Sequence, residues 1–174
     1  MQQTVTIAST VRANLTCAAG AVALMTAAFA AQAATPATTY NYYVAPNGSD
    51  AAAGTRAAPF KTLARAAKAA IKAGTTVWVA PGTYAGGIKT VANGAAAARI
   101  YWVSTTKWGA KIVPPANSTN NSAWDNRGSY VSIIGFDVDG SKIGSGTKWV
   151  HGIYTGGSYN VIDGNHVHHM ATTI

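Results

Sequence analysis

Apolar and polar positions follow two different patterns along the chain. Between residues 59 and 73 the apolar side chains recur at the three- and four-residue spacing of one helical face, with basic side chains on another face. The apolar members are Phe60, Leu63, Ala67 and Ile71. Pro59 suits the first turn of a helix, and Gly74 suits the position after its last turn. We therefore predict one amphipathic helix over residues 59–73, with a solvated basic face.

Outside this segment the helical spacing is absent. Short apolar runs are bounded instead by glycine, proline, asparagine or serine, which is typical of strands. The runs are 42–44, 77–79, 100–103, 131–138 and 159–167. After the helix they recur roughly every 20–30 residues, a spacing that indicates a solenoid of stacked coils.

The last two runs repeat each other in detail. The stretch GSYVSIIGFDVDG begins at Gly128 and GSYNVIDGNHVHHM begins at Gly157, so a shift of 29 residues superimposes them and places Val138 on Val167. A single coil cannot bury its own apolar face, so neighbouring coils must supply the core. We predict a β-solenoid in which residues 29 apart in these runs are vertical neighbours. The segment between the two runs is expected to form a return path and a loop.

Residues 1–33 have the features of an export signal. They contain one basic residue, Arg12, no acidic residue, an apolar stretch, and a small-x-small site that ends at Ala33. We predict cleavage after Ala33, a secreted or periplasmic location, and no stable membrane span after cleavage. The single cysteine, Cys17, lies in this signal, so no disulfide holds the remaining chain together.

The remaining chain is basic. Removal of Arg12 takes the formal net charge from +8 to +7. For an exported protein, this charge favours an acidic glycan as the partner over a nucleic acid.

Two strings near the N-terminal end resemble a known family. YYVAPNGSDAAAGTRAAPFKTLARAAKAA and TTVWVAPGTYAGG are similar to the cap and first coil of secreted right-handed parallel β-helix proteins of the pectate-lyase-like superfamily, nearest to polysaccharide lyase family nine. The resemblance covers roughly residues 42–170. It implies an all-β fold, a right-handed parallel β-helix whose cap, with the amphipathic helix, spans 34–75 and whose roughly four coils span 76–174. It implies a carbohydrate-active protein but not one activity, because the scaffold hosts lyases, hydrolases and non-catalytic adhesins.

Three histidines near the end of the chain allow three interpretations. In the 29-residue register, strand alternation puts His166 beside Asp137 and His168 beside Asp139 on the outer face. His169 has no partner in this register, and alternation does not place it with the other two, which weighs against a zinc site. The other interpretations are solvent-facing histidines with carboxylate neighbours, and a substrate-binding polar stripe formed by His166, His168 and Asp137.

The resemblance to lyases implies specific chemistry. β-Elimination on a uronic acid removes the proton at C5, and a Ca²⁺ ion on the adjacent carboxylate makes that proton more acidic. Family-nine lyases take calcium ligands from aspartates on neighbouring coils, which points to Asp137, Asp139 and Asp163 here. The base would be a lysine with a depressed pKa, either Lys142 or Lys148, or a group on later coils. The expected cofactor is calcium, and the expected substrate is an acidic, uronate-containing polysaccharide.

Two other functions stay open at this point. A non-catalytic β-helix would bind glycan or join a surface assembly, and a glycoside hydrolase would use Asp137 and Asp139 as its two carboxyl groups. Asn165, at the turn before the histidines, is expected to be a structural, stacked asparagine. The chain stops just after a strand without a capping repeat, so we expect it to be the N-terminal part of a longer protein whose remaining coils complete the solenoid.

Overall fold

The computed structural model describes residues 39–116, 119–141 and 149–171. The predicted signal and the two candidate base residues, Lys142 and Lys148, lie outside the described residues. In chain order the elements are β1 (Tyr40–Val44), α1 (Leu63–Ala69), β2 (Thr75–Val79), β3 (Gly82–Ala85), β4 (Ile88–Thr90), β5 (Ile100–Ser104), β6 (Ala110–Val113), β7 (Ser122–Asn126), β8 (Val131–Ile134), β9 (Asp137–Asp139), β10 (His151–Thr155), β11 (Val161–Asp163) and β12 (His166–His168).

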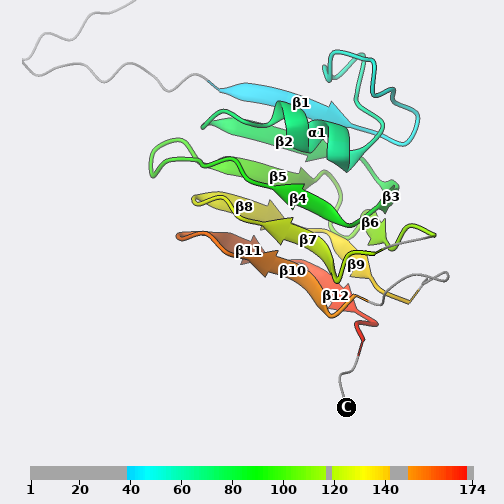
Figure 1. The fold of residues 1–174 in the computed structure, drawn as a ribbon. Helices are drawn as coiled ribbons and strands as arrows, with labels where there is room; N and C mark the ends of the chain where they lie inside the picture. Colours follow the sequence, from blue (N-terminus) through cyan, green and yellow to red (C-terminus); the bar gives the residue numbers. More distant parts are fainter. Residues whose placement is uncertain (1–38, 117–118, 142–148, 172–174) are drawn as a thin grey trace, which may run out of the picture. The chain divides into compact units, whose positions relative to one another are not determined.

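The strands stack into three parallel sheets (Figure 1). The sheet orders are β1-β2-β5-β8-β11, β3-β6-β9-β12 and β4-β7-β10. Each of the coils β2-β3-β4, β5-β6-β7 and β8-β9-β10 gives one strand to every sheet, and β11 and β12 begin a further coil. This arrangement confirms the predicted parallel β-helix.

The predicted register between the last two coils is also confirmed. Val138 pairs with Val167, and Ile133 pairs with Ile162, each 29 residues further along the chain. The segment between the two repeats is not only a return path and loop, because it contains strand β10, which pairs with β7. The strand was missed because Gly152 lies within it, which leaves an apolar run of only two residues, Ile153 and Tyr154.

Aromatic side chains pack within and between coils, and one asparagine joins two neighbouring coils. Trp124 meets Trp102 edge to face at 5.0 Å between ring centroids and meets Phe136 at 5.4 Å. Asn165 Oδ1 accepts a 2.8 Å hydrogen bond from the Phe136 N–H, and its Nδ2 donates a 2.8 Å bond to the Ile133 carbonyl. Both partners belong to the previous coil, so the predicted structural role of Asn165 is confirmed.

The helix begins later than predicted. It spans Leu63–Ala69 and not residues 59–73, and Thr62 is its N-cap. The reason lies in Phe60. Its N–H donates to the Tyr43 carbonyl, and it forms a parallel bridge with Val44, the last residue of β1. The backbone is therefore held extended at Phe60, and helical geometry cannot start until this pairing ends.

The helix also ends earlier, and it buries a different face. Ala70 is the C-cap and leaves helical geometry. Leu63, Ala66 and Ala70 are buried, whereas Ile71 is 62% exposed. The prediction that Ile71 belongs to the buried stripe is therefore wrong, because the helix ends before this residue. In the described part of the chain, no helix has the length and apolar composition needed to cross a bilayer.

The last coil is exposed on one side. Val167, expected to face the core, is 43% exposed, and Ile162 is 44% exposed. Val138, directly above Val167 in the register, is fully buried. The difference arises because no described strand lies beyond β11 or β12 in their sheets.

Candidate functional site

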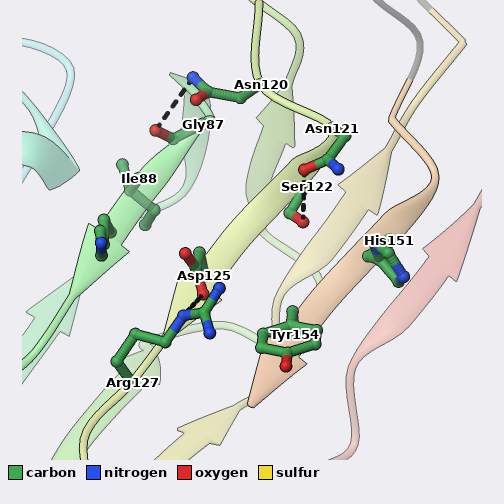
Figure 2. A pocket seen from close by; sticks show the side chains of 10 residues that line it. Gly87, Ile88, Asn120, Asn121, Ser122, Asp125, Arg127, His151 and Tyr154 are labelled. Atoms are coloured by element: carbon green, nitrogen blue, oxygen red, sulfur yellow. Dashed lines mark hydrogen bonds and ion pairs between the residues drawn. The ribbon is translucent and has the colours of Figure 1, made fainter. Parts of the chain in front are cut away.

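A groove of about 250 Å³ opens on the sheet formed by β4, β7 and β10, and Figure 2 shows the side chains that line it. The parallel register places Lys89, Asp125 and Tyr154 side by side across these three strands. Trp124, next to Asp125, is fully buried in the core. Because side chains alternate between the faces of a strand, the row of Lys89, Asp125 and Tyr154 faces outward into the groove.

The groove combines cations with an aromatic face. Arg127 Nε donates a 2.6 Å hydrogen bond to Asp125 Oδ1, and this bond raises the pKa of Arg127. The Arg127 guanidinium lies 4.6 Å from the centre of the Tyr154 ring, and His151 contacts the same ring at 5.7 Å. Lys89 has no ion-pair partner among the described residues. The groove thus carries two cations and one carboxylate, beside a tyrosine whose ring is partly exposed.

The sequence interpretation did not find this groove. The signal was present, because the 29-residue shift that superimposes the last two repeats also carries Asp125 onto Tyr154 and Ser122 onto His151. Extending the comparison upstream of Gly128 would have revealed the third sheet and its outward row.

A larger hollow of about 620 Å³ lies beside β1 and β2. Trp78 and Arg56 line it, and the Trp78 Nε1–H donates to Asn41 Oδ1 at 3.0 Å. It holds a single charged side chain, Arg56. The groove on β4, β7 and β10 is therefore the better match for a charged ligand.

A second polar group lies on the sheet that contains β6, β9 and β12. We call it the histidine cluster, and its members are Lys111, Asp137, Asp139, His166, His168 and His169. Lys111 Nζ lies 3.0 Å from Asp137 Oδ2 and 3.4 Å from Asp139 Oδ2. The two aspartates point away from the core, as predicted, yet they are only 6% and 8% exposed because their partners cover them.

The histidines contact the Oδ1 atoms of the two aspartates, whereas Lys111 contacts the Oδ2 atoms. His166 Nδ1 and His168 Nε2 lie 3.0 and 2.8 Å from Asp137 Oδ1. His169 Nδ1 lies 3.1 Å from Asp139 Oδ1 and 2.6 Å from His168 Nδ1. The expectation that His169 has no partner is wrong. His169 follows the strand in a left-handed backbone conformation, with φ of 55°, so strand alternation no longer sets the direction of its side chain.

The charges of the cluster shift the pKa values of its members. Burial raises the pKa of Asp137, but hydrogen bonds from Lys111 and His168 lower it more, so the net shift is downward. Burial also raises the pKa of Asp139, but hydrogen bonds from Ser141 and His169 lower it more, so this pKa falls well below its usual range. The hydrogen bond to Asp137 raises the pKa of Lys111. Lys111 therefore holds its proton firmly and is unsuited to act as a base.

The structure brings together only two of the three predicted calcium ligands. Asp137 and Asp139 share strand β9, whereas Asp163 is exposed on β11, in a different sheet. The cluster nevertheless has the composition of a possible metal site. Two overlapping groups of three, Asp137 with His166 and His168, and Asp139 with His168 and His169, each have their potential ligand atoms within 4.8 Å of one another.

The donor set suits calcium poorly. Ca²⁺ takes about six to eight oxygen ligands, whereas the cluster offers imidazole nitrogens and two carboxylates that already bind an ammonium group. Two carboxylates that are already paired with Lys111 provide fewer oxygen ligands than calcium requires.

Comparison with known proteins decides the family. A model of the Pel9A-like, right-handed β-helix region matches residues 42–173. The chain belongs to the Pel9A-like right-handed β-helix family. An uncharacterized protein of Bacillus subtilis strain 168, YwoF, is 30% identical over 139 residues, covering 75% of this chain and 29% of the relative. A solved rhamnogalacturonan lyase superimposes with a TM-score of 0.53 and 25% identity, over 70% of this chain and 34% of that chain.

The family assignment confirms the sequence resemblance and the all-β, right-handed parallel β-helix. This Pel9A-like chain has a polysaccharide-lyase-like scaffold. It spans about a third of the length of the relatives described above.

Proposed function

We propose that this Pel9A-like chain binds an acidic, uronate-containing polysaccharide along the groove on β4, β7 and β10. The observation that carries the proposal is the outward row of Lys89, Asp125 and Tyr154, with Arg127 held over the tyrosine ring. The rhamnogalacturonan lyase with a similar fold supports an acidic polysaccharide as the ligand class.

Each part of the groove matches one feature of such a polymer. Lys89 offers an ammonium group that no described carboxylate neutralises, so it is available to a uronate carboxylate. Arg127 presents a planar guanidinium whose Nη donors can bind a carboxylate while Nε remains bonded to Asp125. The exposed part of the Tyr154 ring provides an apolar surface against which a sugar ring can pack.

We further propose that β-elimination requires a longer protein with further coils, of the length that the relatives have, and that the protein is exported. Lys142 and Lys148 remain proposals for the base, as does a group on later coils, since Lys111 is held protonated. His166 and His168 remain candidates for sugar contacts at the edge of the stack. Calcium stays a proposal that rests on the family resemblance, with ligands beyond the described residues or from the polysaccharide itself.

For this chain alone, glycan binding without turnover is the second candidate, and one observation favours it. Lys111, the described lysine that contacts Asp137 and Asp139, is ion-paired with both carboxylates, which raises its pKa and makes it unsuited to act as a base. A hydrolase that uses Asp137 and Asp139 is disfavoured, because hydrolysis requires one carboxyl group with a raised pKa as the acid. Both of these carboxylates have lowered pKa values.

Affinity electrophoresis in gels that contain polygalacturonate tests the binding proposal. One ion pair at about 4 Å in water is worth about 1 kcal/mol, so Lys89→Ala should weaken binding roughly fivefold at low salt, and added salt should reduce the difference. Lys107→Ala is the matched control, because Lys107 is also exposed but lies between β5 and β6, outside the groove. Equal weakening by both variants would show that diffuse positive charge, and not the groove, binds the polymer.

Turnover is followed separately by the ultraviolet absorbance of the unsaturated product, with and without Ca²⁺. We expect little or no product from this chain and calcium-dependent product from the longer protein. Product from neither, with binding intact, would leave the protein as a glycan-binding β-helix.

A further inference from the structure

We propose that Asp139, His168 and His169 bind a divalent transition metal ion, with Zn²⁺ as the best-matched ion, and that Asp137 and Lys111 position these ligands. The site lies on the β6-β9-β12 sheet, whereas the polysaccharide groove lies on the β4-β7-β10 sheet. It does not depend on the proposed polysaccharide function.

The three donor atoms have separations that suit one small ion. Asp139 Oδ1 lies 3.1 Å from His169 Nδ1 and 3.7 Å from His168 Nδ1, and the two histidine nitrogens are 2.6 Å apart. In a tetrahedral site with metal–ligand bonds of about 2.0–2.1 Å, neighbouring ligand atoms lie about 3.3 Å apart. The observed separations fall on both sides of this value, so side-chain torsions alone can bring the atoms to it.

Asp137 selects the tautomer of His168 that a metal needs. His168 Nε2 lies 2.8 Å from Asp137 Oδ1, and we assign it as the N–H donor of this hydrogen bond. His168 Nδ1 then carries a lone pair and is directed at Asp139 and His169. A carboxylate that accepts from the second ring nitrogen is the usual outer-shell partner of a metal-bound histidine.

Lys111 orients both carboxylates in the same way. It contacts the Oδ2 atom of each aspartate, while every histidine contact is made by an Oδ1 atom. The Oδ1 atom of Asp139 is therefore turned toward the histidines. Two carboxylates and one ammonium leave the cluster with one net negative charge when its histidines are neutral, which favours a cation.

The donor chemistry selects a transition metal over calcium. Imidazole nitrogen with one carboxylate suits zinc, copper or nickel, whereas calcium prefers oxygen ligands. The site is accessible, because the side chains of His168 and His169 are 21% and 62% exposed. Three protein ligands leave a fourth position for water, as in zinc sites that keep an open coordination position.

The experiment uses the purified chain after removal of any polyhistidine tag. Titration with Co²⁺ should produce visible ligand-field bands of a tetrahedral site at one equivalent, and Zn²⁺ should abolish them. A hundredfold excess of Ca²⁺ should leave the bands unchanged. Absence of the bands and of Zn²⁺ binding by calorimetry, or displacement by Ca²⁺, would overturn the proposal and leave a hydrogen-bonded histidine cluster.

Variants test the assignment of each ligand. We expect His168→Ala and His169→Asn to weaken Co²⁺ binding at least tenfold; asparagine tolerates the left-handed backbone at position 169. Asp137→Asn should weaken it roughly 10–100-fold through the orientation of His168. His166→Ala should leave the Co²⁺ affinity within twofold, because His166 contacts Asp137 and not the proposed ligand Asp139. A loss with His166→Ala would overturn the assignment in favour of Asp137, His166 and His168.

Asp163→Asn and His151→Ala are matched controls, since they remove a carboxylate and an imidazole outside the cluster. Both should keep the wild-type affinity, and a loss in either would show non-specific surface binding. Far-ultraviolet circular dichroism and tryptophan emission of each variant report whether the stack is intact, so a loss of binding is interpreted only in folded protein.

Discussion

Asn165 offers a direct measure of how firmly neighbouring coils are joined. Replacement by alanine removes the acceptor for the Phe136 N–H and the donor to the Ile133 carbonyl, each at 2.8 Å. A typical intramolecular hydrogen bond contributes about 0.5–1.5 kcal/mol net, and a buried group left without a partner costs about 1–3 kcal/mol. Because Asn165 lies in the last described coil and is only partly buried, water can reach part of the gap. We therefore expect a loss of about 2 kcal/mol.

Urea unfolding followed by tryptophan fluorescence measures this loss, and hydrogen exchange locates it. Exchange of the Phe136 amide should accelerate most, since that N–H loses its acceptor. Asn165→Asp should fall between wild type and alanine, because an aspartate can accept from Phe136 but cannot donate to Ile133. Asn47→Ala, at an exposed turn, should stay within about 0.5 kcal/mol of wild type. A loss at Asn165→Ala below that limit, with unchanged exchange at Phe136, would refute the role of this side chain in joining the coils.

Three further predictions follow from the cap and the groove. Burial raises the pKa of Asp50, but the bonds from the Thr62 hydroxyl and from the Thr62 and Lys61 N–H groups lower it more. The stabilisation from Asp50 should thus be present above its ordinary pKa of 3.8 and be lost as pH falls below it. In urea unfolding, the free energies of wild type and Asp50→Asn should differ by about 1 kcal/mol at neutral pH and converge in acid. A gap that stays constant with pH would contradict this. Gly54→Ala should cost more than Gly164→Ala in thermal unfolding: both glycines have positive φ, costing about 1–2 kcal/mol with alanine, but only at Gly54 would the new Cβ meet the Phe60 ring, adding about 1–3 kcal/mol. Equal losses would show that the ring moves aside freely. Arg127→Lys should weaken polygalacturonate binding in the gel assay, since lysine keeps the charge but loses the planar donor pair; unchanged binding would show that charge alone acts there.

The groove and the histidine cluster lie on different sheets of one stack, so they can be separated experimentally. Groove variants should change glycan affinity without changing Co²⁺ binding, and cluster variants should do the reverse. Loss of both properties in a single variant would indicate damage to the coil itself, because β9 and β10 belong to the same coil.

The repeat in the sequence was sufficient to determine the class of fold and much of the register. Parallel coils of equal length place residues at a constant offset side by side, so the match of Gly128 with Gly157 already implied the pairing of Val138 with Val167. The same offset placed His166 beside Asp137. The structural role of Asn165 was expected from the resemblance to β-helices, in which this turn often carries an asparagine, because the repeat itself places Phe136 at the equivalent position.

Only the tertiary structure decided where local patterns give way to long-range contacts. The helix is shorter than its periodicity because Phe60 pairs with Tyr43, a contact that no helical pattern contains. His169 joins the cluster because its backbone turns left-handed after the strand, so alternation stops predicting the direction of its side chain. Asp163 is separated from Asp137 because the chain bends between strands and sends them to different sheets. A repeat specifies which residues stack, but the corners between strands determine which side chains converge on one site.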